Sequence, residues 1–324
     1  TRAAATIDPE VSTASAYRVA LPSDAEIPPA VQRITGITRA DAEWPLPATD
    51  VWQKLVQAAK RSAAAGQMEK CPTIIHYCRF EKAFLEHLHA QIKQPAAFPF
   101  DIICTHEIAK RLLPGLPRRG LRAVAGFMGH TVPRRRRSGA HAIATAVIWQ
   151  HFVRQLARDH GVETLDQLAD WLKGTAPQTR TGRDYPMQPE IRINLPYKPG
   201  IYRMLRSNGD LLYIGKATSL KQRVNSYFRP KGPHAEHTLE MLSQAANLAV
   251  TRTGSALEAA VLESDLIKQH SPPYNVALQT GQRKLTFSSR NFATWAAQPD
   301  ADDCIGPLPQ GLMTAAMRAF ANWH

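Results

Sequence analysis

The chain has 324 residues, which is enough for two domains that each bury their own core. Its 40 lysines and arginines against 27 aspartates and glutamates give a formal net charge of +13. This excess favours a polyanionic partner such as nucleic acid, because neutralised phosphates release their condensed counterions. The plain alternative is a soluble protein that happens to be basic. No apolar run approaches the length of a membrane-spanning helix, so no membrane partner is expected.

The four cysteines show no framework spacing, which indicates a reducing compartment and a cytoplasmic location. Cys71, His76 and Cys78 lie close together, but they form no CxxC pair and fall in a stretch typical of a buried strand. We therefore do not expect a zinc site there. The start of the chain shows no signal-peptide pattern. The chain begins with threonine instead of methionine, so we expect a trimmed or fragmentary N-terminus.

Residues 1–173 alternate strand-like and helix-like runs, which predicts an α/β domain. The predicted strands are Thr73–Tyr77 and Phe98–Cys104, and the predicted helices are Phe80–His89, Glu107–Leu113, Leu121–Met128 and Ala142–Leu156. Residues 174–196 are polar and contain proline and glycine, as is typical of a linker.

Residues 197–280 predict a second, smaller domain with the element order ββααβα. Strands at 201–205 and 211–214 flank Asn208-Gly209, a pair that supplies the positive φ angles of a tight hairpin turn. Helices follow at 218–228, with Thr218 as N-cap, and at 236–246; a strand at 248–253 and a helix at 256–269 complete the order. Ser255 and Glu258 form a capping box for the last helix. Residues 281–324 are a C-terminal extension that we cannot assign.

The predicted hairpin presents one tyrosine on each strand, Tyr202 and Tyr213, and Lys216 follows on the second strand. Taken alone, the tyrosines could be a packed cross-strand pair, and Lys216 and Arg223 could be solvated surface charges. Glu263 is different, because a carboxylate among apolar residues needs a partner or a metal ion. A single carboxylate of this kind can hold a hard divalent ion that keeps most of its waters.

The order of these residues resembles that of the GIY-YIG endonucleases. The resemblance rests on Gly200-Ile201-Tyr202 and Tyr213-Ile214-Gly215-Lys216, the segments that carry the family's two motifs. Within that superfamily, 261–268 (VLESDLIK) and Pro273-Tyr274-Asn275 are most similar to the UvrC-like excinucleases. The resemblance implies a small sheet backed by helices that incises DNA in nucleotide-excision repair, on the 3′ side of a lesion. It also implies one Mg²⁺ or Mn²⁺ ion.

By this resemblance, the catalytic residues are Tyr202, Tyr213, Lys216, Arg223, Tyr227 and Glu263, of which Glu263 also holds the metal. The implied DNA contacts of this domain are Gly215, Lys216, Arg223 and Asn275. The cations would neutralise charge that develops on the phosphate, and one tyrosine would take the proton of the attacking water. A tyrosine ordinarily has a pKa near 10, so its deprotonation at neutral pH costs about 4 kcal/mol. The sequence leaves open which tyrosine is the base.

The first block resembles, less closely, the DEDDh 3′–5′ exonucleases, which have an RNase H-like fold and bind two metal ions. The segment 76–85 (HYCRFEKAFL) is similar to their second motif, with Glu81 in place of aspartate, and 34–38 (ITGIT) fits a preceding stretch. The opening Asp-x-Glu motif is absent, and His141 and Arg136 replace the last aspartate and the histidine. Because two-metal catalysis needs several carboxylates, we expect no exonuclease activity. Whether Glu81 and His141 keep any metal binding stays open.

Four consecutive arginines, Arg134–Arg137, form a dense cationic run near the presumed cleft of this block. Such a run is either a solvated loop or a phosphate contact, and we count Arg134 and Arg135 as candidate DNA-binding residues. The sequence therefore predicts a mixed α/β DNA endonuclease that works with DNA and with other excision-repair proteins. The alternatives are an active 3′–5′ exonuclease with an accessory GIY-YIG domain, and a DNA-binding scaffold without catalysis.

Overall fold

The computed structural model of the chain describes residues 14–21, 25–38, 45–91, 97–133, 138–178, 182–229, 234–275, 285–290, 294–296 and 304–309. The candidate DNA-binding residues Arg134 and Arg135, and Arg136 of the exonuclease alignment, lie outside the described residues. None of the described helices is both long enough and apolar enough to cross a membrane.

The chain divides into two compact units, and each combines segments that are distant in sequence. The first unit consists of Thr1–Leu195, Met204–Leu212 and Val224–Ala249. The second unit consists of Pro196–Arg203, Tyr213–Arg223 and Val250–His324. The first break falls at the end of the expected linker, but two later stretches of the predicted second domain group with the first unit. The domain boundaries predicted from the sequence thus differ from the division into compact units.

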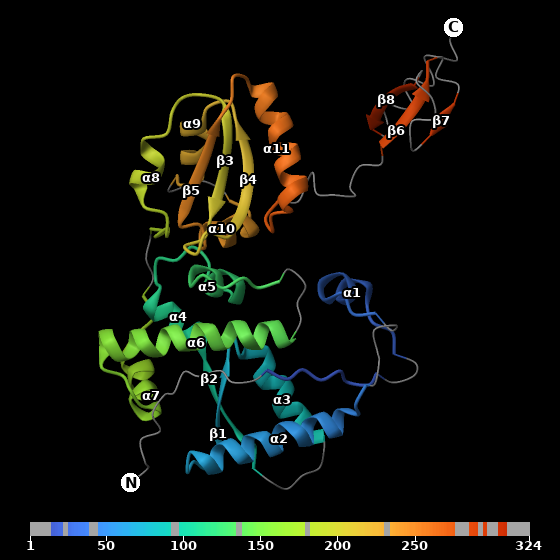
Figure 1. Ribbon diagram of the computed structural model, residues 1–324. Helices are drawn as coiled ribbons and strands as arrows, with labels where there is room; N and C mark the ends of the chain where they lie inside the picture. Colours follow the sequence, from blue (N-terminus) through green and yellow to red (C-terminus); the bar gives the residue numbers. More distant parts are fainter. Residues whose placement is uncertain are drawn as a thin grey trace. The chain divides into compact units, whose positions relative to one another are not determined.

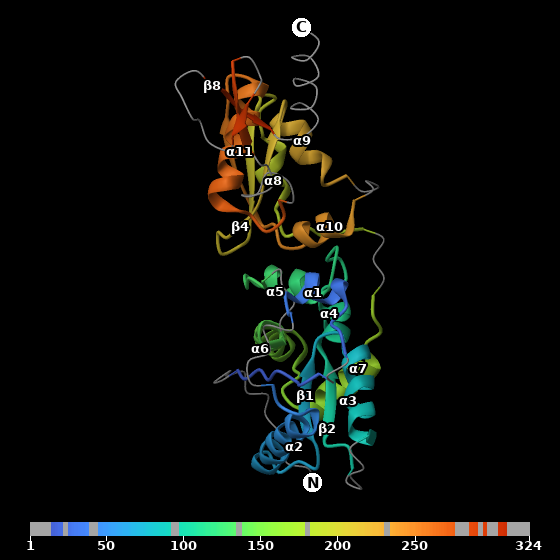
Figure 2. The ribbon, with the colours of Figure 1, turned by 90° about the vertical axis from the view of Figure 1, so that its right-hand side faces the viewer.

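The first unit contains a two-stranded parallel sheet with a helical crossover (Figure 1). Strand β1 (Cys71–Ile75) pairs with β2 (Phe100–Cys104) along their whole lengths, and helix α3 (Arg79–Gln91) connects them. Figure 2 shows α3 and α6 (Ser138–His160) on either side of these strands. A βαβ unit of this kind confirms that the block is α/β. The RNase H-like fold expected for it stays a prediction.

Helices supply most of the core of this unit. They are α1 (Pro29–Thr35), α2 (Ala48–Ala65), α4 (Thr105–Leu112), α5 (Leu121–Phe127), α6 and α7 (Leu165–Gly174). Fully buried Ile108, Val124, Ile148 and Phe152 form the centre of one apolar cluster, drawn from α4, α5 and α6. The helices expected in this block are present, and their ends differ from the expected ones by a few residues.

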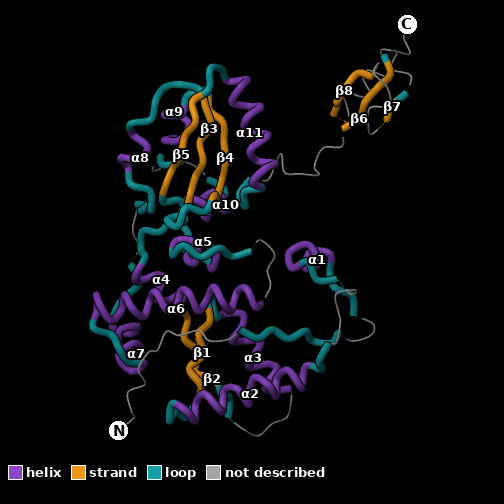
Figure 3. The backbone as a smooth tube through the Cα atoms, viewed as in Figure 1, coloured by secondary structure: helices purple, strands orange, loops and turns teal. Residues whose placement is uncertain are grey.

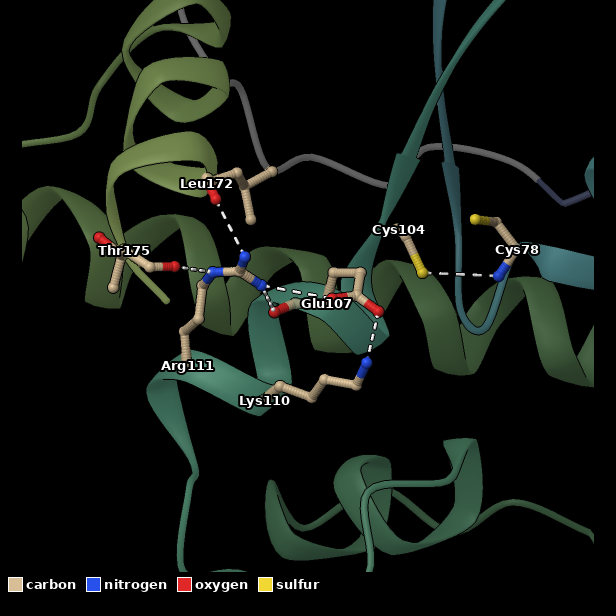
Figure 4. A network of polar contacts seen from close by, with 7 residues as sticks. All are labelled: Cys78, Cys104, Glu107, Lys110, Arg111, Leu172 and Thr175. Carbon is tan, nitrogen blue, oxygen red and sulfur yellow. Dashed lines mark hydrogen bonds and ion pairs between the residues drawn. The ribbon is translucent and has the colours of Figure 1, made fainter. Parts of the chain in front are cut away.

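Arg111 on α4 links the C-terminal end of α7 to this core (Figure 4). Its guanidinium donates to the backbone oxygens of Leu172, at 2.9 Å, and of Thr175, both near the C-terminal end of α7. The same Arg111 side chain donates to the Glu107 backbone oxygen at 2.8 Å, and the Glu107 carboxylate also accepts from Lys110 at 2.7 Å. A cation at a helix C-terminus satisfies unpaired carbonyls and opposes the negative end of the helix dipole.

His76, at the end of β1, is buried and held from both ring nitrogens. Nδ1 lies 2.9 Å from the Thr105 hydroxyl, and Nε2 lies 2.9 Å from the backbone oxygen of Arg119. Because a carbonyl can only accept, Nε2 carries the proton and Nδ1 accepts from Thr105. Cys78 is engaged separately, since its backbone N–H donates to the Cys104 sulfur at 3.5 Å. Both nitrogens of His76 are therefore used in packing the strand ends, which leaves neither for a metal.

The segment expected to be a linker carries structure of its own. It contains the short helix α8 (Pro189–Ile193), and its Asp184 backbone N–H donates to Gly115 at 2.8 Å. The Arg192 guanidinium donates to Asn225 at 2.7 Å and lies 4.5 Å from the centre of the Phe228 ring. The polar composition therefore belongs to a segment that packs on its neighbours, and its role as a linker between domains stays a prediction.

A second sheet has the order β4-β3-β5, and it is made from β3 (Gly200–Leu205), β4 (Leu211–Ala217) and β5 (Asn247–Arg252). Helices α9 (Leu220–Ser226), α10 (Glu236–Leu242) and α11 (Ala256–His270) complete the expected ββααβα order. In Figure 1, α11 runs beside β4. A third sheet is antiparallel and has the order β7-β6-β8; its strands are orange in Figure 3. That sheet comprises β6 (Leu285–Ser289), β7 (Trp295–Ala296) and β8 (Cys304–Pro309), in the extension that the sequence pattern left unassigned.

Two local expectations for this region need correction. In the β3–β4 turn, Gly209 has φ +91°, whereas Asn208 does not adopt a positive φ. The Asn208 side chain instead accepts from the Asp210 backbone N–H at 3.0 Å, so one glycine is enough for this longer turn. At the start of α9, the hydroxyl of Ser219 rather than of Thr218 accepts from the Gln222 backbone, at 3.5 Å. Helix α9 accordingly begins at Leu220.

The buried histidine predicts a pH-dependent stability for the first unit. Burial lowers the pKa of His76 from 6.5 to about 4, so the unfolded chain takes up this proton at higher pH than the folded chain. Stability should therefore be fully present above pH 6.5 and fall by about 3 kcal/mol as the pH drops to about 4. Burial also lowers the pKa values of His106 and His130, which adds to the effect in the same direction.

Urea unfolding at several pH values between 4 and 7 would test this expectation. His76→Gln should be less stable at pH 7 and lose much of the pH dependence. The matched control is His151→Gln, because His151 is exposed on α6 and should leave the pH profile of the natural sequence unchanged. A His76→Gln profile as steep as that of the natural sequence would contradict the assignment.

Candidate active site

The two tyrosines of the hairpin lie together but differ in exposure. Their ring centres are 6.0 Å apart with planes tilted by 43°, so they make a cross-strand aromatic contact. Tyr202 is fully buried, with 0% of its surface exposed, whereas Tyr213 is half-buried. The packing interpretation of the pair is therefore correct for both rings, and Tyr213 in addition keeps part of its surface open.

Gly215 is the residue that makes room for this pair. A Cβ at this position would overlap the Cζ atom and the hydroxyl of Tyr202, and it would lie 2.8 Å from the Tyr213 ring. From the sequence, we expected Gly215 to let the backbone approach a phosphate. That expectation stays untested, and the structure adds a packing reason for glycine here, because a side chain at 215 would enter the space that the Tyr202 ring occupies.

The outer edge of β4 is closed by side chains instead of by another strand. The sheet order leaves β4 at the edge, where residues two apart direct their backbone groups to the same side. Asn275 pairs with Ile214 in both directions, accepting from its N–H at 3.0 Å and donating to its oxygen at 2.8 Å. Asn275 is only 6% exposed, so the structure gives it a bracing role for β4. DNA contact by Asn275 was expected from the resemblance and stays untested.

Glu263 closes the same edge one step further along. Its Oε1 accepts the Lys216 backbone N–H at 3.0 Å, and its Oε2 lies 3.2 Å from the Lys216 ammonium. The Glu263 side chain is 11% exposed, while that of Lys216 is 51% exposed. The structure thus brings together two of the predicted site residues in a double interaction, and it satisfies a carboxylate that lies among apolar residues in the sequence. Each carboxylate oxygen still has a second lone pair for another ligand.

The remaining predicted site residues, Arg223 and Tyr227, lie on helix α9 and just after it. Arg223 lies on α9 and is exposed. Tyr227 follows the end of α9 and is 8% exposed. Its ring stacks with that of His234, with centres 6.4 Å apart and planes 20° apart. Sequence reasoning did not find this partner, because the resemblance pointed to Tyr227 as a catalytic residue without indicating what it contacts.

Two other acidic residues on α11, Glu258 and Asp265, differ from Glu263 in their contacts and exposure. Glu258 accepts from the Gly254 backbone N–H at 2.7 Å, and its own N–H donates to Ser255 Oγ at 3.1 Å. This confirms the capping interpretation, with the difference that the reciprocal donor is Gly254. Asp265 is exposed, as expected. Glu263 is the carboxylate of this helix that is buried against β4.

The donor set around Glu263 fits one particular kind of metal site. Within the described ranges, no group of three or more histidine, cysteine, aspartate or glutamate side chains is arranged to hold an ion. Glu263 would therefore be the single protein ligand, as suits Mg²⁺ or Mn²⁺ with several retained waters and does not suit zinc. The nearby ammonium of Lys216 shows that the carboxylate already lies beside one positive charge in this structure.

The packing around Gly215 predicts the result of a small substitution. Gly215→Ala should lower the free energy of unfolding by about 1–3 kcal/mol, because the buried Tyr202 ring cannot move away from the added methyl group without displacing its neighbours. Urea unfolding is the measurement. Gly120→Ala is the control, since nothing lies within 4 Å of a Cβ at Gly120. Equal stability of the two variants would show that Tyr202 can move to accommodate a side chain at 215.

Comparison with known proteins gives a family for this part of the chain. Residues 198–276 match the family model described as the UvrC-like GIY-YIG domain. The UvrABC system protein C of Psychrobacter sp. (strain PRwf-1) is 51% identical over 91 residues, which are 28% of this chain and 15% of that protein. The same protein of Francisella tularensis subsp. novicida is 51% identical over 83 residues, or 26% of this chain and 13% of that protein.

Among solved structures, the chain is similar to the GIY-YIG N-terminal endonuclease domain of UvrC from Thermotoga maritima, which was solved with magnesium. The identity is 34%, and the match covers 28% of this chain and all of that domain, with a TM-score of 0.25. The chain spans only about 15% of the length of the first curated relatives. The expected resemblance of this region to a UvrC-type GIY-YIG domain is confirmed by the family match and by these relatives.

Proposed function

We propose that this protein is a divalent-metal-dependent endonuclease that hydrolyses phosphodiester bonds in DNA, in nucleotide-excision repair. The observation that carries the proposal is the match of residues 198–276 to the UvrC-like GIY-YIG domain, within which Glu263 is paired twice with Lys216. The excess of basic residues over the whole chain suits a DNA substrate. DNA and the other proteins of excision repair are the partners that follow, and the expected location is cytoplasmic.

Tyr213 is the better candidate for the residue that takes a proton from the attacking water. A general base must reach the water, and Tyr213 keeps part of its side chain exposed while Tyr202 is fully enclosed. The Tyr202 ring then serves to hold the Tyr213 ring from the side, at a centre-to-centre distance of 6.0 Å. Gly215 allows this contact, and the bracing of Ile214 by Asn275 keeps the strand that carries Tyr213 in place.

Lys216 and Arg223 supply the fixed positive charge that phosphoryl transfer needs. Lys216 is half exposed and held beside Glu263, and Arg223 is exposed on the first helix after the hairpin. Both can donate to phosphate oxygens, and preorganised cations stabilise charge that develops in the transition state. A divalent ion held by Glu263 and water would polarise the scissile phosphate and stabilise the leaving oxygen.

For the first block, we propose a degenerate relative of the DEDDh exonucleases that does not cut DNA. Its candidate second-motif carboxylate, Glu81, lies exposed on the first turn of α3. His141 lies on the first turn of α6, in the position that the alignment gives to the last aspartate. One carboxylate cannot gather the charge of two divalent ions, so exonuclease catalysis is not expected. An end-labelled single strand incubated with metal should keep its full length.

The metal-site assignment is tested by nicking of a closed circular plasmid. Glu263→Gln should lower the rate of Mg²⁺-dependent nicking by at least about 100-fold, because the amide keeps an acceptor for the Lys216 N–H but removes the charge. DNA affinity should change by less than about threefold, since Lys216 and Arg223 remain. Both are measured on the purified full chain.

Asp265→Asn is the matched control, because it removes a carboxylate from the same helix at an exposed position. It should nick at the rate of the natural sequence. Nicking by Glu263→Gln at the control rate would remove the metal assignment. If the natural sequence binds plasmid but does not nick it with Mg²⁺ or Mn²⁺, the chain is instead the DNA-binding scaffold that the sequence leaves as an alternative.

A further inference from the structure

Tyr77 in the first unit has a backbone conformation that is unusual for an aromatic residue. Its φ is +65°, in the left-handed region that disfavours residues with a bulky side chain. The other described non-glycine residues with positive φ are Gln67, which follows the C-cap of α2, and Ser271, which is the C-cap of α11. A left-handed conformation is common at helix C-termini. Tyr77 instead precedes α3 and carries an aromatic ring. Strain of this kind concentrates at functional sites.

The strained backbone holds the Tyr77 ring in an exposed aromatic cluster. The ring stacks with Phe80, with centres 6.4 Å apart and planes 26° apart, and meets His106 edge-on at 4.7 Å. Tyr77 is 46% exposed and Phe80 is 73% exposed, so the cluster is not a core. His76 packs against this cluster, since its ring centre lies 5.7 Å from that of His106, and both of its ring nitrogens are hydrogen-bonded.

The cluster lies where α/β folds place their ligands. Strands β1 and β2 are parallel, so Ile75 and Cys104 end at the same edge of the sheet. Tyr77 follows β1 and His106 follows β2, which puts both rings at the carboxyl edge. This edge is the usual position of a binding site in parallel sheets.

The charge around the cluster indicates which kind of ligand it can bind. The segment 105–122, which follows β2, has a single acidic residue, Glu107, and five basic ones: Lys110, Arg111, Arg118, Arg119 and Arg122. On α3, Arg79 and Lys82 flank Phe80, with Glu81 and Glu86 as the acidic neighbours. Lys110 and Arg111 pair with Glu107, Arg118 pairs with Glu236, and Arg122 pairs with Glu240. The Arg119 guanidinium donates to the backbone oxygens of Leu113 and Pro114, which carry no charge, so its positive charge remains beside His106. Exposed aromatic faces in positive surroundings suit unpaired nucleotides, whose bases stack on them without regard to sequence.

We propose that Tyr77, Phe80 and His106 form a stacking platform for an unpaired base of single-stranded DNA. The platform is separate from the GIY-YIG site and does not depend on Glu263, so it can be tested without cleavage. It gives the first unit a binding role for DNA that needs none of the carboxylates of an exonuclease. A duplex keeps its bases stacked internally, so the platform favours single strands over double strands.

The test uses fluorescence anisotropy of the full chain in EDTA, with a labelled 20-nucleotide oligothymidine and a labelled 20-base-pair duplex. Tyr77→Gly removes the ring and relieves the positive φ, so its thermal midpoint should be unchanged or higher. Its affinity for the single strand should fall about tenfold, and its affinity for the duplex should stay within about twofold. Phe80→Ala should act in the same direction, whereas Tyr77→Phe keeps a stacking ring and should bind like the natural sequence.

The matched control is Phe84→Ala, which removes an aromatic side chain of similar exposure, 65%, one turn further along α3. It should leave single-strand affinity unchanged. The slope of affinity against salt concentration should stay the same in Tyr77→Gly, because stacking releases no counterions. Equal single-strand affinity of Phe80→Ala and Phe84→Ala would overturn the proposal, as would an equal loss on single strand and duplex. Either result would leave the nuclease proposal standing.

Discussion

The carboxylate of Glu263 at the open edge of β4 is the interaction on which the candidate site depends. It accepts the Lys216 backbone N–H at 3.0 Å and pairs with the Lys216 ammonium at 3.2 Å. One group thereby does two things that are usually separate. It completes the hydrogen bonding of an edge strand, which would otherwise leave polar groups unpaired, and it places a negative charge beside a cation at the strand surface.

Because Glu263 both braces the edge strand and carries the negative charge, the candidate site needs few residues. Asn275 braces Ile214, and Glu263 braces Lys216, so the backbone between them is held at both ends. Gly215 lies in that braced stretch, and its missing side chain leaves room for the Tyr202 ring. The packing and the catalytic interpretations of the tyrosines are therefore compatible. A buried Tyr202 is a core residue, and by filling the core it fixes the neighbour that remains accessible.

Local signals were sufficient to predict the elements of the second sheet and its helices. A Gly in a turn, a Ser with Glu three residues later and a 3.6-residue apolar period all act within a few residues of where they occur. The roles of Asn275 and Glu263 could not be predicted in the same way, because their partners are 61 and 47 residues away. The family resemblance identified both residues, but not what they contact. The sheet of β6, β7 and β8 carried too weak a pattern for us to assign.

The grouping of the β3–β4 turn with the first unit has a physical cause in a buried arginine. The Arg206 side chain is 3% exposed, and a charge so enclosed must be matched by acceptors. It donates to Gln244 at 3.1 Å and to Asp210 at 3.1 Å, and it also contacts the Thr131 hydroxyl. Hydrogen bonds from Thr131 and Asn208, together with the charge of Arg206, lower the pKa of Asp210, so the acceptor stays ionised.

Further contacts join the same parts of this unit. The Asn208 side chain donates to the Gly129 oxygen at 2.7 Å, and Gly126 lies so close to Gln244 that a Cβ there would overlap its side chain. The hairpin turn is thus hydrogen-bonded to residues 129–131, and Gly126 packs against Gln244, which also accepts from Arg206. These contacts make the turn between β3 and β4 part of the first unit.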